Sequence, residues 1–270
     1  PDRQAVGERE GERVGAVGEA VARGVERIAV ESLRPAVGLV HRVTGRVLES
    51  GETMLADAAT LERGVICSSA GNHAQGVALA AQRRNLRAVV VMPITTPSIK
   101  VDAVTALGGE VVLHGDTYDD AYTQAMRLAS AEGLVFIHPF DDPDVIAGQG
   151  TIGAEILRQA EQNVDAIFVP IGGGGLIAGI AAYVKSRQPG VRIIGVEPED
   201  SAAMRDSVAA GEPIELDHVG IFADGVAVRR VGDETLRLCR EYVDEFITVD
   251  TDEICAAIRD IFEDTRSIVE

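Results

Sequence analysis

The stretch "DAIFVPIGGGGLIAGIAAYVKSRQ", residues 165–188, joins a short apolar run to a helical pattern through four consecutive glycines. A β-branched run followed by a helix of this length is typical of a βαβ unit with a buried parallel strand. At the carboxyl end of such a strand, residues without Cβ atoms let successive N–H groups converge on a phosphate. A flexible strand-to-helix connection is the alternative, and four glycines at an apolar junction disfavour it.

The same alternation of strand and helix extends outward from this loop, beginning near residue 55. Strands are predicted at 64–69, 87–93, 110–115, 134–140, 166–172, 192–199 and 246–249. Helices are predicted at 72–84, 97–108, 118–133, 145–160, 175–188, 233–245 and 252–264. This order predicts an α/β protein with mostly parallel sheets.

A change of pattern at "PFDDPDVIAGQG", residues 139–150, predicts a boundary between two α/β domains. We expect a smaller domain over residues 55–142 and a larger domain over 143–270 that is incomplete at its C-terminus. Residues 1–54 are rich in Gly, Val, Arg and Glu and carry few start or stop signals, so they stay unassigned.

Composition excludes several function classes. The 270 residues are 46% hydrophobic and carry a net charge of −18, which argues against nucleic acid or an anionic membrane as a partner. No apolar run is long enough to span a membrane. Three cysteines fit neither a metal site nor a full set of disulfides, so we expect reduced thiols and a cytoplasmic protein.

A second loop of small residues, "CSSAGNHAQG" at 67–76, follows a predicted strand and opens a predicted helix. Small residues allow close approach of the backbone, and N–H groups at a helix start bind anions. This loop therefore predicts a second anion site, with Asn72 beside it.

The glycine run also fits a dinucleotide fingerprint. Gly173, Gly175 and Ala178 have its spacing, and Glu197 stands about 20 residues further on, where a ribose-binding acid is expected. An NAD-binding oxidoreductase is therefore an alternative, although it leaves the loop at 67–76 without a role.

The two loops together resemble those of the fold-type II pyridoxal-phosphate (PLP) enzymes, whose architecture is tryptophan synthase β-like. Within them the chain resembles the biosynthetic threonine ammonia-lyases, also called threonine dehydratases. The resemblance runs from about residue 60 to the end. It rests on "GVICSSAGNHAQGVALAA", "VMPITTPSIKVDAVTALGGEVVLHG", "PFDDPDVIAGQGTIGAEIL", "VPIGGGGLIAG", "GVEPEDS" and "FADGVAVRRVGDETLRLCREYVD".

This resemblance implies roles for both loops. The residues that cradle the PLP phosphate would be Gly172, Gly173, Gly174, Gly175 and Leu176. The residues that bind the substrate carboxylate would be Ser69, Ala70, Gly71, Asn72 and His73, with Asn72 also contacting the 3′-oxygen of the cofactor. For His73, a purely structural role at the helix start is an equal alternative.

Two positions separate this chain from the similar serine racemases. Those enzymes carry a second Ser where Ala70 stands, and Ala70 cannot exchange a proton, so the resemblance favours elimination over racemisation. Glu197 matches the first ligand of a racemase-like cation site, but Ala203 falls where a carboxylate would be needed. We therefore expect no metal.

The lysine that forms the Schiff base with the cofactor is missing. The family carries it about 30 residues before Asn72, near residues 40–47, but "AVGLVHRVTGRVLES" at 36–50 contains none. The chain has two lysines, Lys100 and Lys185, and the pattern around both is that of solvated surface residues. The catalytic residue is therefore unknown.

The resemblance implies the conversion of L-threonine to 2-oxobutanoate and ammonia, a step of isoleucine biosynthesis, by a homo-oligomeric enzyme. Without the lysine we expect this activity to be lost or severely impaired. Three hypotheses follow: an enzyme whose chain is damaged or truncated, a catalytically dead protein that binds PLP and carboxylates, and the NAD-binding oxidoreductase.

Overall fold

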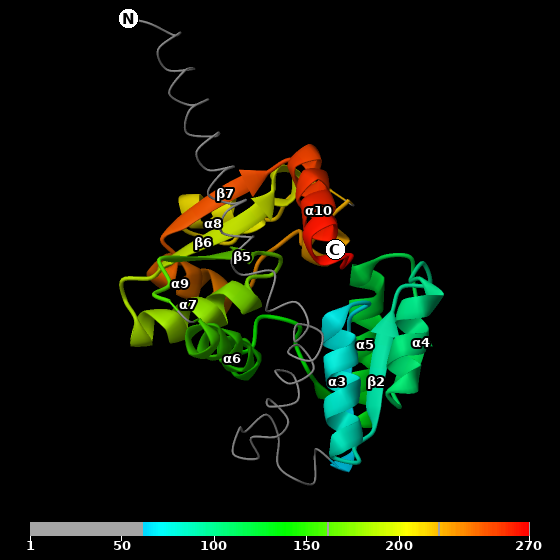
Figure 1. Ribbon diagram of the computed structural model, residues 1–270. Helices are drawn as coiled ribbons and strands as arrows, with labels where there is room; N and C mark the ends of the chain where they lie inside the picture. The colour runs from blue at the N-terminus through cyan, green and yellow to red at the C-terminus, as the bar shows by residue number, and fades with distance from the viewer. Residues whose placement is uncertain (1–61, 161, 221, 270) are drawn as a thin grey trace, which may run out of the picture.

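The computed structural model describes residues 62–160, 162–220 and 222–269 (Figure 1). The predicted N-terminal segment 1–54, with the stretch 36–50 that lacks the expected lysine, lies outside the described residues. None of the described helices is long and apolar enough to cross a membrane.

The first half of the described chain forms a four-stranded parallel sheet. Its strands are β1 (Val65–Ser68), β2 (Ala88–Met92), β3 (Glu110–Leu113) and β4 (Val135–Phe136), in the order β3-β2-β1-β4. Three helices alternate with them: α3 (Asn72–Arg83), α4 (Ser98–Ala106) and α5 (Tyr118–Glu132). The helix α5 begins at a capping box between Thr117 and Asp120, which satisfies two of its first-turn amides.

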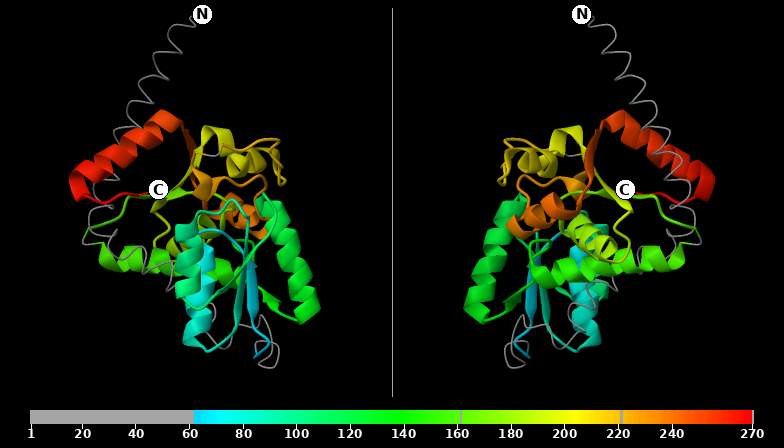
Figure 2. Two further views of the ribbon diagram at one scale, coloured as in Figure 1. Left: turned by 90° about the vertical axis from the view of Figure 1, so that its right-hand side faces the viewer. Right: turned by 90° about the vertical axis from the view of Figure 1, so that its left-hand side faces the viewer.

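Helices cover both faces of this sheet, as Figure 2 shows. Along β1, Val65 and Cys67 pack into the cluster that α3 and α4 complete. Ile66 points to the opposite face and joins the cluster of α5. Because both faces are covered, every residue of β1 and β2 is buried, and all of them except Ser68 are apolar, as the sequence pattern indicated.

The second half forms a three-stranded parallel sheet of β5 (Ala166–Pro170), β6 (Arg192–Pro198) and β7 (Glu245–Val249), in the order β5-β6-β7. The helices of this half are α6 (Pro143–Gln159), α7 (Gly175–Arg187), α8 (Ala203–Ala210), α9 (Asp233–Tyr242) and α10 (Thr251–Thr265). Two short 3-10 helices, η1 (Glu199–Ser201) and η2 (Asp224–Val226), lie in the connections.

Close packing of α6 on α7 fixes the position of the glycine loop, because α7 begins at that loop. A Cβ atom on Gly179 of α7 would lie 2.3 Å from the carbonyl oxygen of Ile146 and 2.6 Å from the amide nitrogen of Gly150, both in α6. The backbones of the two helices therefore touch here without an intervening side chain.

These observations confirm the predicted α/β class and its parallel sheets, with three local differences. The helix predicted at 233–245 ends at Tyr242, and Glu245 already belongs to β7. The strand predicted at 134–140 is only two residues long, because the chain turns after Ile137: His138 Nδ1 accepts hydrogen bonds from the amides of Phe140 and Asp141, at 3.3 and 2.8 Å. The helix α8 was not predicted, and it begins where the buried Glu197 accepts its first amides. The domain boundary near residue 142 stays a prediction.

Candidate functional site

The loop Gly172–Gly175 presents a row of free amides at the start of α7. Gly174 is the N-cap residue, with φ of 96°, and it supplies no side-chain cap. Within the described part of the chain, the N–H groups of Gly172, Gly173 and Gly174 donate to no backbone or side-chain acceptor. Gly173 and Gly174 are buried, and a buried amide without an acceptor is costly unless a ligand satisfies it.

Most other helix starts in the described chain are already satisfied. Thr117, Asp142 and Asp250 cap α5, α6 and α10 with their own side chains. Carboxylates from elsewhere in the chain, Glu197 and Asp141, accept the first amides of α8 and α9. The helices α3, α4 and α7 have no such cap. The N-cap residue is Pro97 in α4 but a glycine in α3 and α7, so the last two N-termini are open to close approach by an anion.

Sterics explain why glycines are needed in the loop at α7. A Cβ atom on Gly173 would lie 2.2 Å from the ring of Phe140, and one on Gly175 would lie 3.0 Å from the Phe140 backbone. The segment after β4 therefore packs directly on the loop. The loop, with its free amides, fits the phosphate of a cofactor such as PLP.

The second predicted loop has the same character. Gly71 is the N-cap of α3 without a side-chain cap, and its amide donates to Ser69 Oγ at 3.2 Å. In this part of the described chain the N–H groups of Ala70, Asn72 and His73 have no acceptor. The side chain of Asn72 is exposed and makes no hydrogen bond to a described residue, so it is available to a ligand.

The imidazole of His73 is already engaged. Its Nε2 lies 3.2 Å from the carbonyl oxygen of Ile137, to which it donates in the neutral form. Burial of the ring lowers the pKa of His73 to about 4. His73 therefore holds the end of β4, and its remaining contribution to an anion site is its backbone N–H.

The structure brings the two loops together through the segment that follows β4. Ile137 accepts the hydrogen bond from His73, and Phe140, three residues later, packs on Gly173 and Gly175. Three residues of chain span at most ~11 Å. Two open helix N-termini, each a candidate site for an anion, therefore lie on either side of one short segment.

Both lysines are paired with carboxylates. Lys100 Nζ lies 3.3 Å from Asp224 Oδ2, and Lys185 Nζ lies 2.7 Å from Asp244 Oδ2. Asp224 belongs to η2, whose Val226 has its Cα 3.3 Å from the Cβ position of Gly172. The side chains of Lys100 and Lys185 are 28% and 16% exposed, so both are partly buried rather than the solvated surface residues expected from their pattern.

The dinucleotide interpretation is not favoured. The side chain of Glu197 is 1% exposed, and its two carboxylate oxygens accept the amides of Met204 and Arg205 at 2.8 and 2.9 Å. A carboxylate that caps α8 in the interior cannot also reach a ribose. Among the described residues no group of three or more His, Cys, Asp and Glu side chains is arranged to hold a metal ion.

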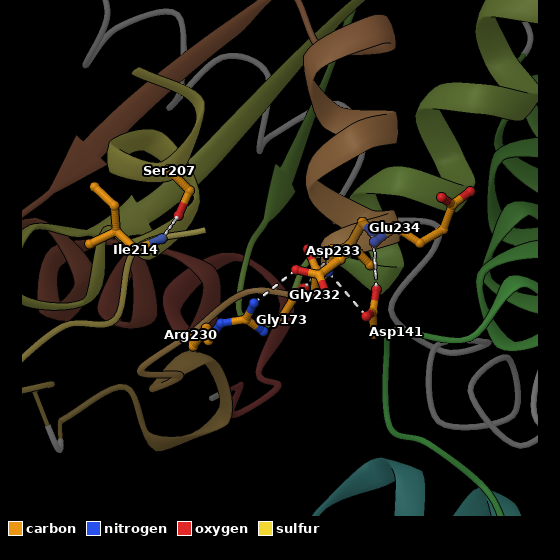
Figure 3. Close-up of polar contacts among 9 residues, drawn as sticks. Asp141, Gly173, Ser207, Ile214, Arg230, Gly232, Asp233 and Glu234 are labelled. Atoms are coloured by element: carbon orange, nitrogen blue, oxygen red, sulfur yellow. Dashed lines mark hydrogen bonds and ion pairs between the residues drawn. The ribbon is translucent and has the colours of Figure 1, made fainter. Parts of the chain in front are cut away.

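Sequence reasoning missed two residues that support the glycine loop. The carboxylate of Asp141 accepts the amides of Asp233, Glu234 and Thr235 at 3.0–3.2 Å, which ties the start of α9 to the segment after β4 (Figure 3). Thr235 Oγ donates to the carbonyl oxygen of Gly173 at 2.8 Å. The only local signal was the string "HPFDD" at 138–142, which indicated no more than a boundary.

Comparison with known proteins identifies the family of the chain. Residues 28–270 match the family described as "Pyridoxal-phosphate dependent enzyme". The chain is 60% identical over 213 residues to the L-threonine dehydratase biosynthetic IlvA of Burkholderia multivorans, covering 78% of this chain and 42% of that protein. It is 53% identical over 207 residues to the protein of the same name from Escherichia coli, covering 77% of this chain and 40% of that one.

Solved structures show the same relationship. Threonine deaminase isoform 2 from Solanum lycopersicum superimposes with a TM-score of 0.80 at 50% identity, covering 85% of this chain and 66% of that chain. Serine racemase from Dictyostelium discoideum gives 0.76 at 32% identity, covering 86% and 72%. The chain spans about two fifths of the length of the curated relatives named above. With its parallel sheets, its glycine loop and a family match over residues 28–270, the chain belongs to the pyridoxal-phosphate dependent enzyme family.

Proposed function

We propose that this chain is the PLP-binding scaffold of a threonine ammonia-lyase, the enzyme that converts L-threonine to 2-oxobutanoate and ammonia. The observation that carries the proposal is the pair of uncapped helix starts at α3 and α7, linked by the segment Ile137–Phe140. The relatives named threonine dehydratase and threonine deaminase support the choice of reaction.

Each loop has a distinct task in this proposal. The amides of Gly172, Gly173 and Gly174 bind the phosphate, with the positive end of the α7 dipole behind them. The amides at the start of α3 and the hydroxyl of Ser69 bind the substrate carboxylate. Asn72 donates from its side-chain amide to the 3′-oxygen. PLP, when bound, supplies an electron sink for the substrate Cα.

Local amides must bind both anions against the charge of the whole chain, which is −18. At physiological ionic strength the Debye length is ~8 Å, so distant surface carboxylates are screened at the site while adjacent amides are not. Anion binding here is therefore a property of the two loops rather than of the protein's net field.

The proposal includes a defect. Proton transfer at the substrate Cα in this family needs a lysine amine. Lys100 is held by Asp224 and Lys185 by Asp244, and the stretch 36–50 holds no lysine. We therefore propose that the chain binds PLP without forming the covalent link and that its ammonia-lyase activity is absent or severely reduced.

A second candidate function rests on the same observation: a catalytically dead protein that binds PLP and carboxylates. This protein and a damaged enzyme would have the same binding chemistry and would differ only in evolutionary origin. The family resemblance also supports a cytoplasmic homo-oligomer, whose stoichiometry sedimentation velocity would measure.

The test is PLP binding by the purified chain, followed by borohydride reduction, peptide mass mapping and an assay for 2-oxobutanoate. We expect the chain to bind PLP, to carry no reduced adduct after borohydride treatment, and to form no 2-oxobutanoate from L-threonine. Failure to bind PLP would refute the scaffold. An adduct on Lys100 or formation of 2-oxobutanoate would refute the proposal that the chain forms no covalent link to PLP and has lost its activity.

A further inference from the structure

The carbonyl group of Gly173 is held from the side opposite to the proposed phosphate. Thr235 Oγ lies 2.8 Å from the Gly173 carbonyl oxygen, and the amide of Gly232 donates to the same oxygen at 3.4 Å. The hydroxyl of Thr235 also lies 3.2 Å from the carbonyl oxygen of Gly232, but a hydroxyl has one hydrogen and the shorter contact is to Gly173. The side chain of Thr235 is fully buried.

This hydrogen bond sets the direction of the next amide. In a planar trans peptide, the carbonyl of Gly173 and the N–H of Gly174 point in opposite directions. Because Thr235 holds the carbonyl toward α9, the Gly174 N–H faces away from α9, and no described residue accepts it. A Cβ atom on Gly174 would lie 2.9 Å from Thr235 Cβ and 2.4 Å from the end of Met204, so Thr235 also forms the floor beneath the loop.

The position of Thr235 is itself fixed by Asp141. Figure 3 shows Asp141 pointing to the first turn of α9, where it accepts three amides, including that of Thr235 at 3.2 Å. A Cβ atom on Gly232 would lie 2.2 Å from Asp141 Oδ1, so the carboxylate packs against the backbone itself. Asp141 thus links the segment after β4, through α9, to the Gly173 carbonyl.

We propose that Thr235 is a positioning residue, which orients the Gly173–Gly174 peptide so that the Gly174 N–H faces the cofactor phosphate. By capping α9, Asp141 fixes the position of Thr235. This inference rests on the proposed binding of PLP. It assigns the support of the loop to Thr235, 62 positions after Gly173, and to Asp141, 32 positions before it.

The test compares Thr235→Val with Thr235→Ser in the full 270-residue chain. Valine keeps the shape of threonine and loses the hydroxyl, whereas serine keeps the hydroxyl. We expect Thr235→Val to weaken PLP binding ~10-fold, which is the effect of losing one hydrogen bond to a charged group, here that of the Gly174 N–H to the phosphate. We expect the affinity of Thr235→Ser to stay within ~2-fold of the unaltered chain. Thr105→Val is the matched control, because Thr105 Oγ donates to the Val101 carbonyl on the exposed face of α4.

A second readout separates positioning from mere stability. The ³¹P chemical shift of bound PLP reports the amides around the phosphate, so we expect it to move in Thr235→Val and not in Thr105→Val. If Thr235→Val does not fold, Asp141→Asn replaces it, with an expected ~3-fold weakening because one of the two acceptor oxygens is lost.

The outcomes are distinguishable. Unchanged PLP affinity and ³¹P shift in Thr235→Val, or in Asp141→Asn where Val does not fold, would overturn the inference and leave the proposed function standing. Failure of the unaltered chain to bind PLP would overturn the proposed function and the inference with it.

Discussion

Gly179 offers the sharpest test of how the glycine loop is held in place, because it lies at the contact between α6 and α7. In Gly179→Ala, the new Cβ atom would lie 2.3 Å from the Ile146 carbonyl oxygen, 2.6 Å from the Gly150 amide nitrogen and 3.0 Å from the carbonyl carbon of Gln149. An ordinary contact between such atoms is ~3.5 Å. All three atoms belong to the backbone of α6, so no rotamer change relieves the clash, and the helices must separate by ~1 Å.

The magnitude follows from two opposing effects. Overpacking a close contact costs ~1–3 kcal/mol, and the upper end applies where only backbone can move. Alanine recovers ~1 kcal/mol over glycine through its higher helix propensity. The net expectation is a loss of ~2 kcal/mol in the free energy of unfolding. With an m-value of ~3 kcal/mol/M, the urea midpoint falls by ~0.7 M.

Urea titration followed by far-UV circular dichroism measures this loss, and two further glycines serve as controls. Gly190→Ala meets no atom within 4 Å, so its effect should stay within ~0.5 kcal/mol. Gly150→Ala lies in the same interface, but its new Cβ atom would lie 3.0 Å from the Gly179 carbonyl oxygen and 3.7 Å from Tyr183 Cβ, so its effect should fall between the two. A midpoint for Gly179→Ala equal to that of Gly190→Ala would refute the close-packing argument.

Three further predictions concern charged and polar groups. Burial lowers the pKa of His73 to about 4, so the unfolded chain binds more protons than the folded one between pH 6.5 and 4. The free energy of unfolding should therefore fall as the pH falls through this window. In urea titrations, His73→Gln should flatten that part of the curve of unfolding free energy against pH. Glu197→Gln removes one of two buried acceptor oxygens and should lower the free energy of unfolding by ~1–3 kcal/mol. NAD should shift the thermal midpoint of neither the unaltered chain nor this variant. Stabilisation of the unaltered chain alone by NAD would restore the dinucleotide interpretation. The pair Lys100–Asp224 should show a coupling below ~1 kcal/mol in a double-mutant cycle of Lys100→Met and Asp224→Asn, because Asp224 is 65% exposed, and a larger coupling would contradict this.

Local sequence signals predicted much of the fold because each element depends on its own neighbours. The apolar run of β2 and the capping box of α5 are readable within a few residues. The end of β4 was predicted too far along because "LVFIHPF" is apolar throughout, and only the side chain of His138, folded back onto two amides, ends the strand at Phe136. Such a turn depends on one side-chain orientation, which hydrophobic pattern does not carry.

The support of the candidate site could not be predicted for a different reason. Asp141 and Glu234 are 93 positions apart, and Thr235 and Gly173 are 62 apart. Hydrogen bonds over such separations leave no periodicity or spacing in a single sequence. The glycine loop itself was predictable because four residues without Cβ atoms are rare and adjacent, whereas an Asp and a Thr that hold it resemble any other polar residues.

The same long-range contacts separate binding from catalysis in this chain. The loop is held by Thr235 from α9, by Phe140 from the segment after β4, and by α6 through Gly179. All of these residues lie in the described chain, and none is a lysine. We expect the loss of a lysine amine elsewhere to remove a covalent link and a proton acceptor and to leave the orientation of the Gly174 N–H unchanged. A member of this family that lacks the lysine should therefore lose catalytic activity and still keep its proposed phosphate site. For this reason PLP affinity and 2-oxobutanoate formation must be measured separately.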